Sequence, residues 1–297
     1  MQIGMTQIDD TYAEAFPMRY TRLVVTAHDE FWLDAALREL TGYGSSVIGC
    51  DAEVGVERHL GTDTPDGRLG AAVLAFAFST DALGTAMVQR VGQSVMTCPT
   101  TAVFNGLQGA DREVPLGKHL RYFGDGFQKS KRLEGIRYWR IPTMEGEFVV
   151  EESLGVEKGV AGGNLVLQAT ELGVALQAAR DAVEAVAPLA EVITPFPGGV
   201  VRSGSKVGSR YEGLRASTAD AFCPTLRGRV ESKLHPAANV ALEIVINGTD
   251  ATVVGDAMAT AIGAAASEGV LCISAGNYGG NLGPFKFELH QLLSASA

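Results

Sequence analysis

Apolar runs alternate with amphipathic stretches in an order that recurs along the chain. A β-branched run at 22–27 precedes a stretch at 29–40 whose apolar residues recur at helical spacing, and 45–49 then has the composition of a strand. The same order of strand, helix and strand continues at 71–78, 80–91 and 94–98. These segments predict two consecutive βαβ units.

The second half of the chain repeats this order. It predicts strands and helices in alternation at 165–169, 171–187, 192 onward, 240–246, 250–266 and 270–274. The tripeptides Thr80-Asp81-Ala82 and Thr249-Asp250-Ala251 each follow an apolar run and open a helix, with side chains suited to capping it. We therefore predict an internally duplicated α+β protein of two ferredoxin-like lobes, each a split βαβ sandwich, over 1–155 and 156–297.

A segment between the two lobes predicts an inserted β-hairpin extension. Residues 118–127 and 136–150 alternate like strands, and they are joined through Gly124-Asp125-Gly126 and a basic run. The cations of this run are Lys129, Lys131 and Arg132. A solvated face or protection of a strand edge explains such cations as well as a binding role does.

Glycine is concentrated in short polar clusters that interrupt the apolar runs. The chain has 36 glycines among 297 residues, which is well above the average share of about 7%. The main clusters lie at 159–164, 195–199, 204–208 and 276–280. Glycine lets the backbone approach a ligand closely, so the clusters favour a binding site, although Gly and Asn also serve turns with positive φ.

Charge, apolar run length and cysteine spacing argue against several classes of protein. The net charge of −10 opposes nonspecific binding to nucleic acid. The N-terminus lacks the pattern of a secretory signal, and the longest apolar run, 70–78, is far shorter than the roughly 20 residues of a membrane-spanning helix. Four scattered cysteines without a CxxC pair predict buried thiols in a reducing cytoplasm and no metal site.

Common catalytic and nucleotide-binding motifs are absent. The segment 199–206 places Ser before Lys, which inverts the order of a phosphate-binding P-loop, and no dinucleotide fingerprint or nucleophile elbow occurs. The tripeptide Cys98-Pro99-Thr100 recurs as Cys223-Pro224-Thr225, but at an offset that differs from that of the helix-opening tripeptides. We interpret it as a site element rather than as a trace of duplication.

One carboxylate interrupts an otherwise apolar strand. Glu243 lies within 240–246, and alternation places it on one face with Ala241 and Val245. If that face is covered, burial raises the pKa of Glu243, and a protonated carboxylic acid can donate to a developing oxyanion. If the face is open to solvent, Glu243 is an ordinary surface charge, and the pattern alone leaves both alternatives.

The sequence resembles formylmethanofuran:tetrahydromethanopterin formyltransferase from about residue 8 to residue 290. The resemblance rests on long motifs in both predicted lobes, at 9–17, 98–101, 123–126, 159–164, 193–199, 204–208 and 275–280. It implies two ferredoxin-like lobes and reversible transfer of a formyl group between formylmethanofuran and N5 of tetrahydromethanopterin. It also implies that no cofactor is bound, that both carriers are substrates, and that the chain forms a homodimer or homotetramer or is a subunit of a formyltransferase/hydrolase complex.

The resemblance also implies a set of site residues. Glu243 matches the family's proposed catalytic carboxylate, and the family's carriers have anionic tails that the cations near Lys129 and Lys131 would suit. The expected substrate-binding residues are Asp10, Thr11, Phe16, Pro17, Cys98, Thr100, Gly124, Asp125, Gly162, Gly163, Asn164, Pro197, Gly198, Ser205, Lys206 and Asn277. Two alternatives stay open at this point, a non-catalytic scaffold subunit of a hydrolase complex and a ferredoxin-like sensor that binds one ligand without turnover.

Overall fold

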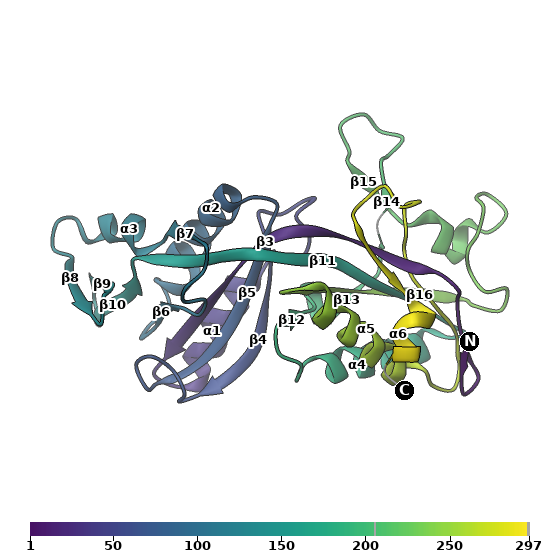
Figure 1. Ribbon diagram of the computed structural model, residues 1–297, viewed down its shortest axis with the longest axis horizontal. Helices are drawn as coiled ribbons and strands as arrows, with labels where there is room; N and C mark the ends of the chain where they lie inside the picture. Colours follow the sequence, from purple (N-terminus) through teal and green to yellow (C-terminus); the bar gives the residue numbers. More distant parts are fainter. Residues whose placement is uncertain (205, 296–297) are drawn as a thin grey trace. The chain divides into compact units, whose positions relative to one another are not determined.

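The computed structural model describes residues 1–204 and 206–295, and the chain divides into two compact units. One unit joins Met1–Pro17 to Val160–Ala297, and the other is Met18–Gly159. Two long strands, β3 (Tyr12–Ala27) and β11 (Ser153–Ala169), carry the chain from one unit into the other (Figure 1). The first seventeen residues thus group with the second half of the chain, while the division into lobes at residue 155 stays a prediction.

The unit Met18–Gly159 contains a complete βαββαβ motif. Its elements are the second part of β3, α1 (Glu30–Thr41), β4 (Glu53–Gly61), β5 (Leu69–Ala77), α2 (Thr80–Arg90) and β6 (Ala102–Asn105). The strands lie in the order β4-β5-β3-β6, and all neighbours are antiparallel. This is the ferredoxin-like arrangement that the sequence predicts.

Three predicted strands in this unit are wrong. Residues 45–49 form turns, and the strand comes later, as β4. Residues 94–98 form the end of a π-helical turn (Val91–Val95) that continues α2, followed by a turn at 96–98. The π-helical turn ends where the Thr101 hydroxyl donates to the Val95 carbonyl at 2.6 Å. Residues 118–127 begin with α3 (Gly117–Leu120) and a 3₁₀ turn (Arg121–Gly124). Short apolar runs do not distinguish a strand from a helical turn.

A β-hairpin extension follows the βαββαβ motif, although its strands differ from those predicted, because the basic run expected to connect two strands is itself a strand and 136–150 contains two. Its strands are β7 (Arg112–Pro115), β8 (Lys129–Leu133), β9 (Ile136–Thr143) and β10 (Gly146–Glu151). The last three form an antiparallel meander, and β10 joins it to β6 in parallel. The side chains of β8 are exposed, so Lys129, Lys131 and Arg132 lie on an open surface.

The other unit repeats the βαββαβ motif. Its elements are the second part of β11, α4 (Leu172–Val186), the short strands β12 (Val192–Ile193) and β13 (Val200–Val201), β16 (Val240–Gly248), α5 (Ala251–Ala265) and β17 (Val270–Ser274). Strands β12 and β13 both pair with β16, followed by β11 and β17, again antiparallel throughout. The order matches that of the first motif, which confirms the internal duplication.

Further short elements complete this unit. They are β1 (Gln2–Ile3), β2 (Thr6–Ile8), β14 (Lys206–Val207), β15 (Ala216–Ser217), β18 (Phe285–Glu288) and α6 (Leu289–Ala295). Strand β2 pairs in parallel with β17 and brings Ile8 opposite Ile273. Among the described residues, no helix combines the length and the apolar character needed to cross a membrane.

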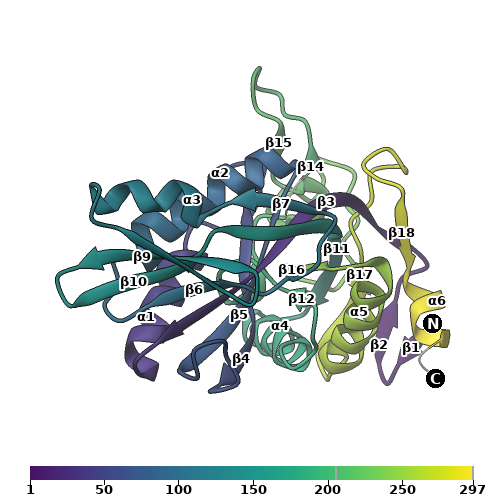
Figure 2. The same ribbon diagram turned by 60° about the vertical axis from the view of Figure 1, so that its left-hand side comes forward.

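The two faces of the β11–β16 sheet have different roles. Leu165 and Leu167 of β11 join Leu242, Ile244 and Ile246 of β16 in the core beneath α4 and α5. Both helices bury alanines, so they pack closely side by side (Figure 2). Period-two alternation sends the intervening side chains to the opposite face, which is the face that carries Glu243.

A polar side chain caps the second helix of each βαββαβ motif. The Asp250 carboxylate accepts the N–H groups of Thr252 and Val253 at the start of α5, as its tripeptide predicts. In α2 the capping side chain is Ser79, one residue before the predicted tripeptide, and its hydroxyl accepts the Ala82 N–H at 3.1 Å. A serine or aspartate oxygen satisfies N–H groups that otherwise lack a partner in the first helical turn.

Candidate active site

Glu243 lies in the middle of the sheet face that the helices leave open. It stands opposite Val166 of β11 on one side and Val201 of β13 on the other. Both valines are buried, with 5% and 6% of their surface exposed. The carboxyl group therefore has apolar neighbours across both strands, and the alternative of an ordinary surface charge does not hold.

A small pocket surrounds the Glu243 side chain. Its walls come from β11, β13, β16 and the segments that follow β13 and β15. They are Val166, Val201, Arg202, Ser203, Gly204, Ala219, Phe222, Cys223, Ala241, Leu242 and Glu243. Burial raises the pKa of Glu243 from its ordinary value of 4.5 to about 7. No residue in the described part of the chain donates a hydrogen bond to this carboxyl group. Near neutral pH a large fraction of Glu243 is thus protonated and able to donate.

Gly204 brings backbone against the Glu243 carboxyl group. Its φ is +53°, and a Cβ placed on it would lie 3.5 Å from Glu243 Oε2 and 2.7 Å from the Ala219 Cβ. This is a close approach that only glycine allows. The next predicted site residue, Ser205, lies outside the described residues. Lys206 follows on β14, and its Nζ pairs with Asp220 Oδ2 at 2.5 Å.

Asn164 ties the glycine-rich loop after β17 to the same sheet face. Only 5% of its surface is exposed, and its Oδ1 accepts the Gly276 N–H at 2.7 Å while its Nδ2 donates to the Gly276 carbonyl at 3.4 Å. The next residue, Asn277, donates from Nδ2 to Thr11 Oγ1 at 3.0 Å. Three predicted site residues, Asn164, Asn277 and Thr11, are therefore brought together by this loop.

A β-bulge shapes the approach to Asn164. The pairing of β11 with β16 shifts register between Val160 and Gly163, and Gly162 within the bulge has a φ of +94°. A Cβ on Gly162 would lie 3.1 Å from the Phe16 ring, so glycine is needed both for its conformation and for its space. The Gly162 N–H donates to Asn247 Oδ1 at 3.1 Å.

The other predicted residues of this unit lie at its surface or at turns. Asp10 is exposed and 3.5 Å from His290 Nδ1, and Pro17 is exposed at the end of the unit. Pro197 and Gly198 form an exposed 3₁₀ turn between β12 and β13, in which Gly198 has a φ of +61°. None of these four residues lines the Glu243 pocket.

Four predicted residues belong to the unit Met18–Gly159. Thr100 has a φ of +68°, which is rare for a β-branched residue, and its N–H donates to Glu145 Oε1 at 2.7 Å. Burial raises the pKa of the nearby Cys98 thiol, which opposes reactivity. Gly124 and Asp125 form the turn after the 3₁₀ segment, where Asp125 has a φ of +49°. The described residues hold no group of three or more His, Cys, Asp or Glu arranged for a metal ion.

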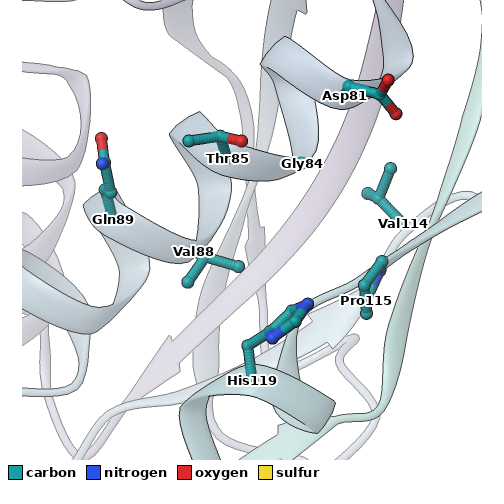
Figure 3. A pocket seen from close by; sticks show the side chains of 8 residues that line it. All are labelled: Asp81, Gly84, Thr85, Val88, Gln89, Val114, Pro115 and His119. Atoms are coloured by element: carbon teal, nitrogen blue, oxygen red, sulfur yellow. The ribbon is translucent and has the colours of Figure 1, made fainter.

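A second hollow in this unit is lined by none of the predicted site residues. Figure 3 shows it between α2, β7 and α3, with Asp81, Gly84, Thr85, Val88, Gln89, Val114, Pro115 and His119 as its walls. Its walls come from the unit Met18–Gly159, whereas Glu243 and its pocket belong to the other unit.

Several residues around the site carry little or no signal in the sequence. Ala219 and Phe222 close the Glu243 pocket, and no pattern in the sequence distinguishes them. Cys223 also lines it, and the recurring Cys-Pro-Thr tripeptide had indicated a site element there. Glu14 is fully buried beside the 276–283 loop, and its signal was a carboxylate in an apolar strand, the same signal that identified Glu243.

Comparisons with known proteins agree along the whole chain. Residues 1–143 match the sequence model of formylmethanofuran-tetrahydromethanopterin formyltransferase, and residues 146–292 match that of its proximal lobe. A protein from Methylococcus capsulatus named formylmethanofuran–tetrahydromethanopterin formyltransferase is 50% identical over 99% of this chain and 100% of its own length.

Two solved structures have the same fold. The formyltransferase from Methanosarcina barkeri is 44% identical, with a TM-score of 0.92 over 98% of this chain and 100% of that one. A chain of the formyltransferase/hydrolase complex from Methylorubrum extorquens, solved with methylofuran, is also 44% identical, with a TM-score of 0.95 over 99% of this chain and 98% of that one. Sequence and fold together show that the chain belongs to the formylmethanofuran–tetrahydromethanopterin formyltransferase family.

Proposed function

We propose that this protein transfers a formyl group reversibly between formylmethanofuran and N5 of tetrahydromethanopterin. Relatives that match it from end to end carry this activity in their names. The observation that carries the proposal is the half-buried Glu243, whose pKa of about 7 leaves about half of it protonated in a pocket at neutral pH. The two carbon carriers are substrates in this proposal, and no bound cofactor takes part.

The reaction proceeds through a tetrahedral intermediate. The lone pair of the pterin N5 attacks the formyl carbon, and the carbonyl electrons move onto oxygen. Collapse of the oxyanion breaks the bond to the methanofuran nitrogen, which gains a proton as N5 loses one. Glu243 in its protonated form donates a hydrogen bond to the oxyanion, a role in which one well-placed donor contributes about 3 to 4 kcal/mol.

Positioning supplies the larger part of the rate. Holding two reactants in attack geometry removes about 7 to 11 kcal/mol from the barrier of a bimolecular reaction. The glycine-rich backbone at Gly162–Gly163 and Gly204, with Asn164, Asn277 and Thr11, suits this task because it forms close and rigid walls in the Glu243 unit. The other predicted binding residues, including Lys206, Cys98 and Thr100, belong to the same proposal as contacts for the carriers.

The proposal includes the assembly of the chain. One relative of known structure is part of a formyltransferase/hydrolase complex solved with methylofuran. We infer that this chain acts either as a homodimer or homotetramer or as the formyltransferase subunit of such a complex, and that it does so in the cytoplasm. Its four cysteines are free thiols, which suits a reducing compartment.

A single-turnover assay with the purified chain tests the proposal. We expect the chain alone to move the formyl group from formylmethanofuran to tetrahydromethanopterin. If transfer requires a hydrolase partner and the isolated chain has no activity, the protein is a scaffold instead. If the chain binds one carrier but no formyl group moves under any condition, it is a ligand sensor.

A further inference from the structure

Glu14 is a buried carboxylate that the proposed chemistry does not use. It lies in the first part of β3 between Ala13 and Ala15, and none of its surface is exposed. An ionised carboxylate in such a place requires compensation by charges or hydrogen-bond donors. The groups that bind the Glu14 carboxylate therefore indicate its role.

Both carboxylate oxygens of Glu14 are filled by backbone N–H groups of one loop. Oε2 accepts from Tyr278 at 2.8 Å and from Gly280 at 3.0 Å. Oε1 accepts from Leu282 and, at 3.1 Å, from Gly283. Desolvation acts to raise the pKa of Glu14, but these N–H groups outweigh it and hold the pKa below its ordinary value. The side chain is a fixed anion around which the loop folds.

Two glycines of the loop have backbone conformations that make the loop costly to order. Gly279 and Gly280 have φ values of +70° and +79°, and glycine in such a segment loses more conformational freedom on ordering than any other residue. Within the loop, Asn281 Nδ2 donates to the carbonyls of Tyr278 and Gly279. Strand β18, which follows, pairs with β3 and anchors the far end of the loop (Figure 2).

The loop begins at the sheet face that carries the candidate acid. Its first residue, Gly276, bonds to Asn164 and accepts the Glu14 N–H at 3.3 Å. Asn164 lies two residues before Val166, the residue opposite Glu243. A change in the loop therefore reaches the wall of the candidate site through a short chain of contacts within one unit.

We infer that Glu14 is a positioning residue for substrate binding: its carboxylate folds the 276–283 loop so that Asn277 and the backbone beside it are ready to hold one of the two carriers. Glu14 touches no reacting atom in this arrangement. It acts through the loop, and this inference rests on the proposed function.

Glu14→Gln is the variant that tests the inference, because an amide keeps one oxygen and turns an N–H donor toward two of the four loop N–H groups. A loop that is folded for only a fraction of the time binds its ligand more weakly in proportion to that fraction. We expect KM for one carrier to rise at least about tenfold while kcat stays within about threefold of the wild type. For Glu14→Asp, which keeps the charge, KM should lie between the values of the wild type and Glu14→Gln.

Hydrogen–deuterium exchange supplies a readout that is independent of activity. In Glu14→Gln, protection should fall at residues 278–283 and stay unchanged in β11 and β16. Glu288→Gln is the matched control, since it makes the same chemical change on the neighbouring β18 and should alter neither exchange nor KM. If Glu14→Gln does not fold, Glu14→Asp carries the same two measurements.

The outcomes separate the two proposals. A fall in kcat with unchanged KM would mean that Glu14 merely maintains the amount of folded enzyme, and it would overturn the inference. Unchanged exchange in the loop would overturn it as well. If the wild type transfers no formyl group, the proposed function fails, yet the exchange measurement still decides whether Glu14 holds the loop.

Discussion

Asn164 and Gly276 form a closed pair in which the side-chain amide of one residue binds both backbone groups of the other. The N–H of Gly276 donates to Asn164 Oδ1 at 2.7 Å, and its carbonyl accepts from Nδ2 at 3.4 Å. An aspartate at position 164 would lack the donor and a leucine would lack both groups. The pair thus explains why an amide occupies a buried position on a strand.

Replacing Asn164 by alanine should loosen this loop. We expect a loss of about 1 to 3 kcal/mol in the free energy of unfolding, because the part-buried N–H of Gly276 loses its acceptor, while its carbonyl keeps only the Glu14 N–H among the described groups. Denaturant unfolding measures the effect. The control is Asn239→Ala, whose amide makes an exposed bond to the Thr170 carbonyl and should cost less than about 0.5 kcal/mol. Equal losses in both variants would refute the anchoring role.

Removing the Glu243 carboxyl group should reduce the chemical step. If it donates to the oxyanion, Glu243→Ala lowers kcat by about 10²- to 10³-fold. Glu243→Gln keeps a weaker donor and should fall at least about tenfold. Single-turnover rates measure both variants, with Glu268→Gln, at an exposed position, as the control. Full activity of Glu243→Gln would sink the assignment.

The pH profile separates a protonated donor from a general base. Because the pKa of Glu243 is about 7, the donor form is lost as pH rises through this value, and kcat for formyl transfer should decline there. Glu243→Gln should lack the decline, since an amide does not titrate in this range. A general base at this position would give the opposite slope, with kcat rising toward pH 8.

Much of the fold follows from local patterns, but the pairing of distant segments does not. Apolar runs located β5 and β16, and helical periodicity located α1, α2, α4 and α5. The strand expected at 94–98 is instead the end of the π-helical continuation of α2 and the turn that follows it, because a short apolar run satisfies either conformation. The grouping of residues 1–17 with the second half depends on pairs such as Ile8 with Ile273, which no local signal contains.

The sequence likewise identified single residues of the site but not their partners. A charge in an apolar strand identified Glu243, but whether its face is covered depended on Ala219 and Phe222, which arrive from a separate segment. Glu14 presents the same signal, and its purpose depends on N–H groups more than 260 residues away. The sequence shows an unusual carboxylate, whereas its partners emerge only from the folded chain.

The ion pair between Lys206 and Asp220 should contribute little to stability. Both side chains are partly exposed, at 42% and 28%, and such pairs are worth about 0 to 1 kcal/mol. If Lys206 also contacts a carrier, Lys206→Ala raises KM by about tenfold, which corresponds to about 1.4 kcal/mol of binding, while unfolding changes little. Asp220→Asn is the control for the pair alone. A large stability loss with unchanged KM would assign Lys206 a structural role.

The exposed cations of β8 offer a test of tail binding. Lys129, Lys131 and Arg132 project from an exposed strand in a chain of net charge −10. Reversing all three charges should raise KM for a carrier with an anionic tail, more strongly at low ionic strength, because salt screens exposed charges. If KM for both carriers is unchanged at low salt, these residues do not bind a tail.

Stability should depend on pH through Glu243 in a defined direction. Its pKa is about 7 in the folded chain and 4.5 ordinarily, so between these values the folded state binds more protons at this site than the unfolded state. The free energy of unfolding therefore decreases as pH rises through this window, by about 3 kcal/mol in total. Glu243→Gln should lack this contribution to the pH dependence, and every other titrating group is the same in the variant and the wild type. Urea unfolding of both proteins at pH 5 and pH 8 isolates it, and identical pH dependence in the two would show that the Glu243 carboxyl group is not desolvated in solution.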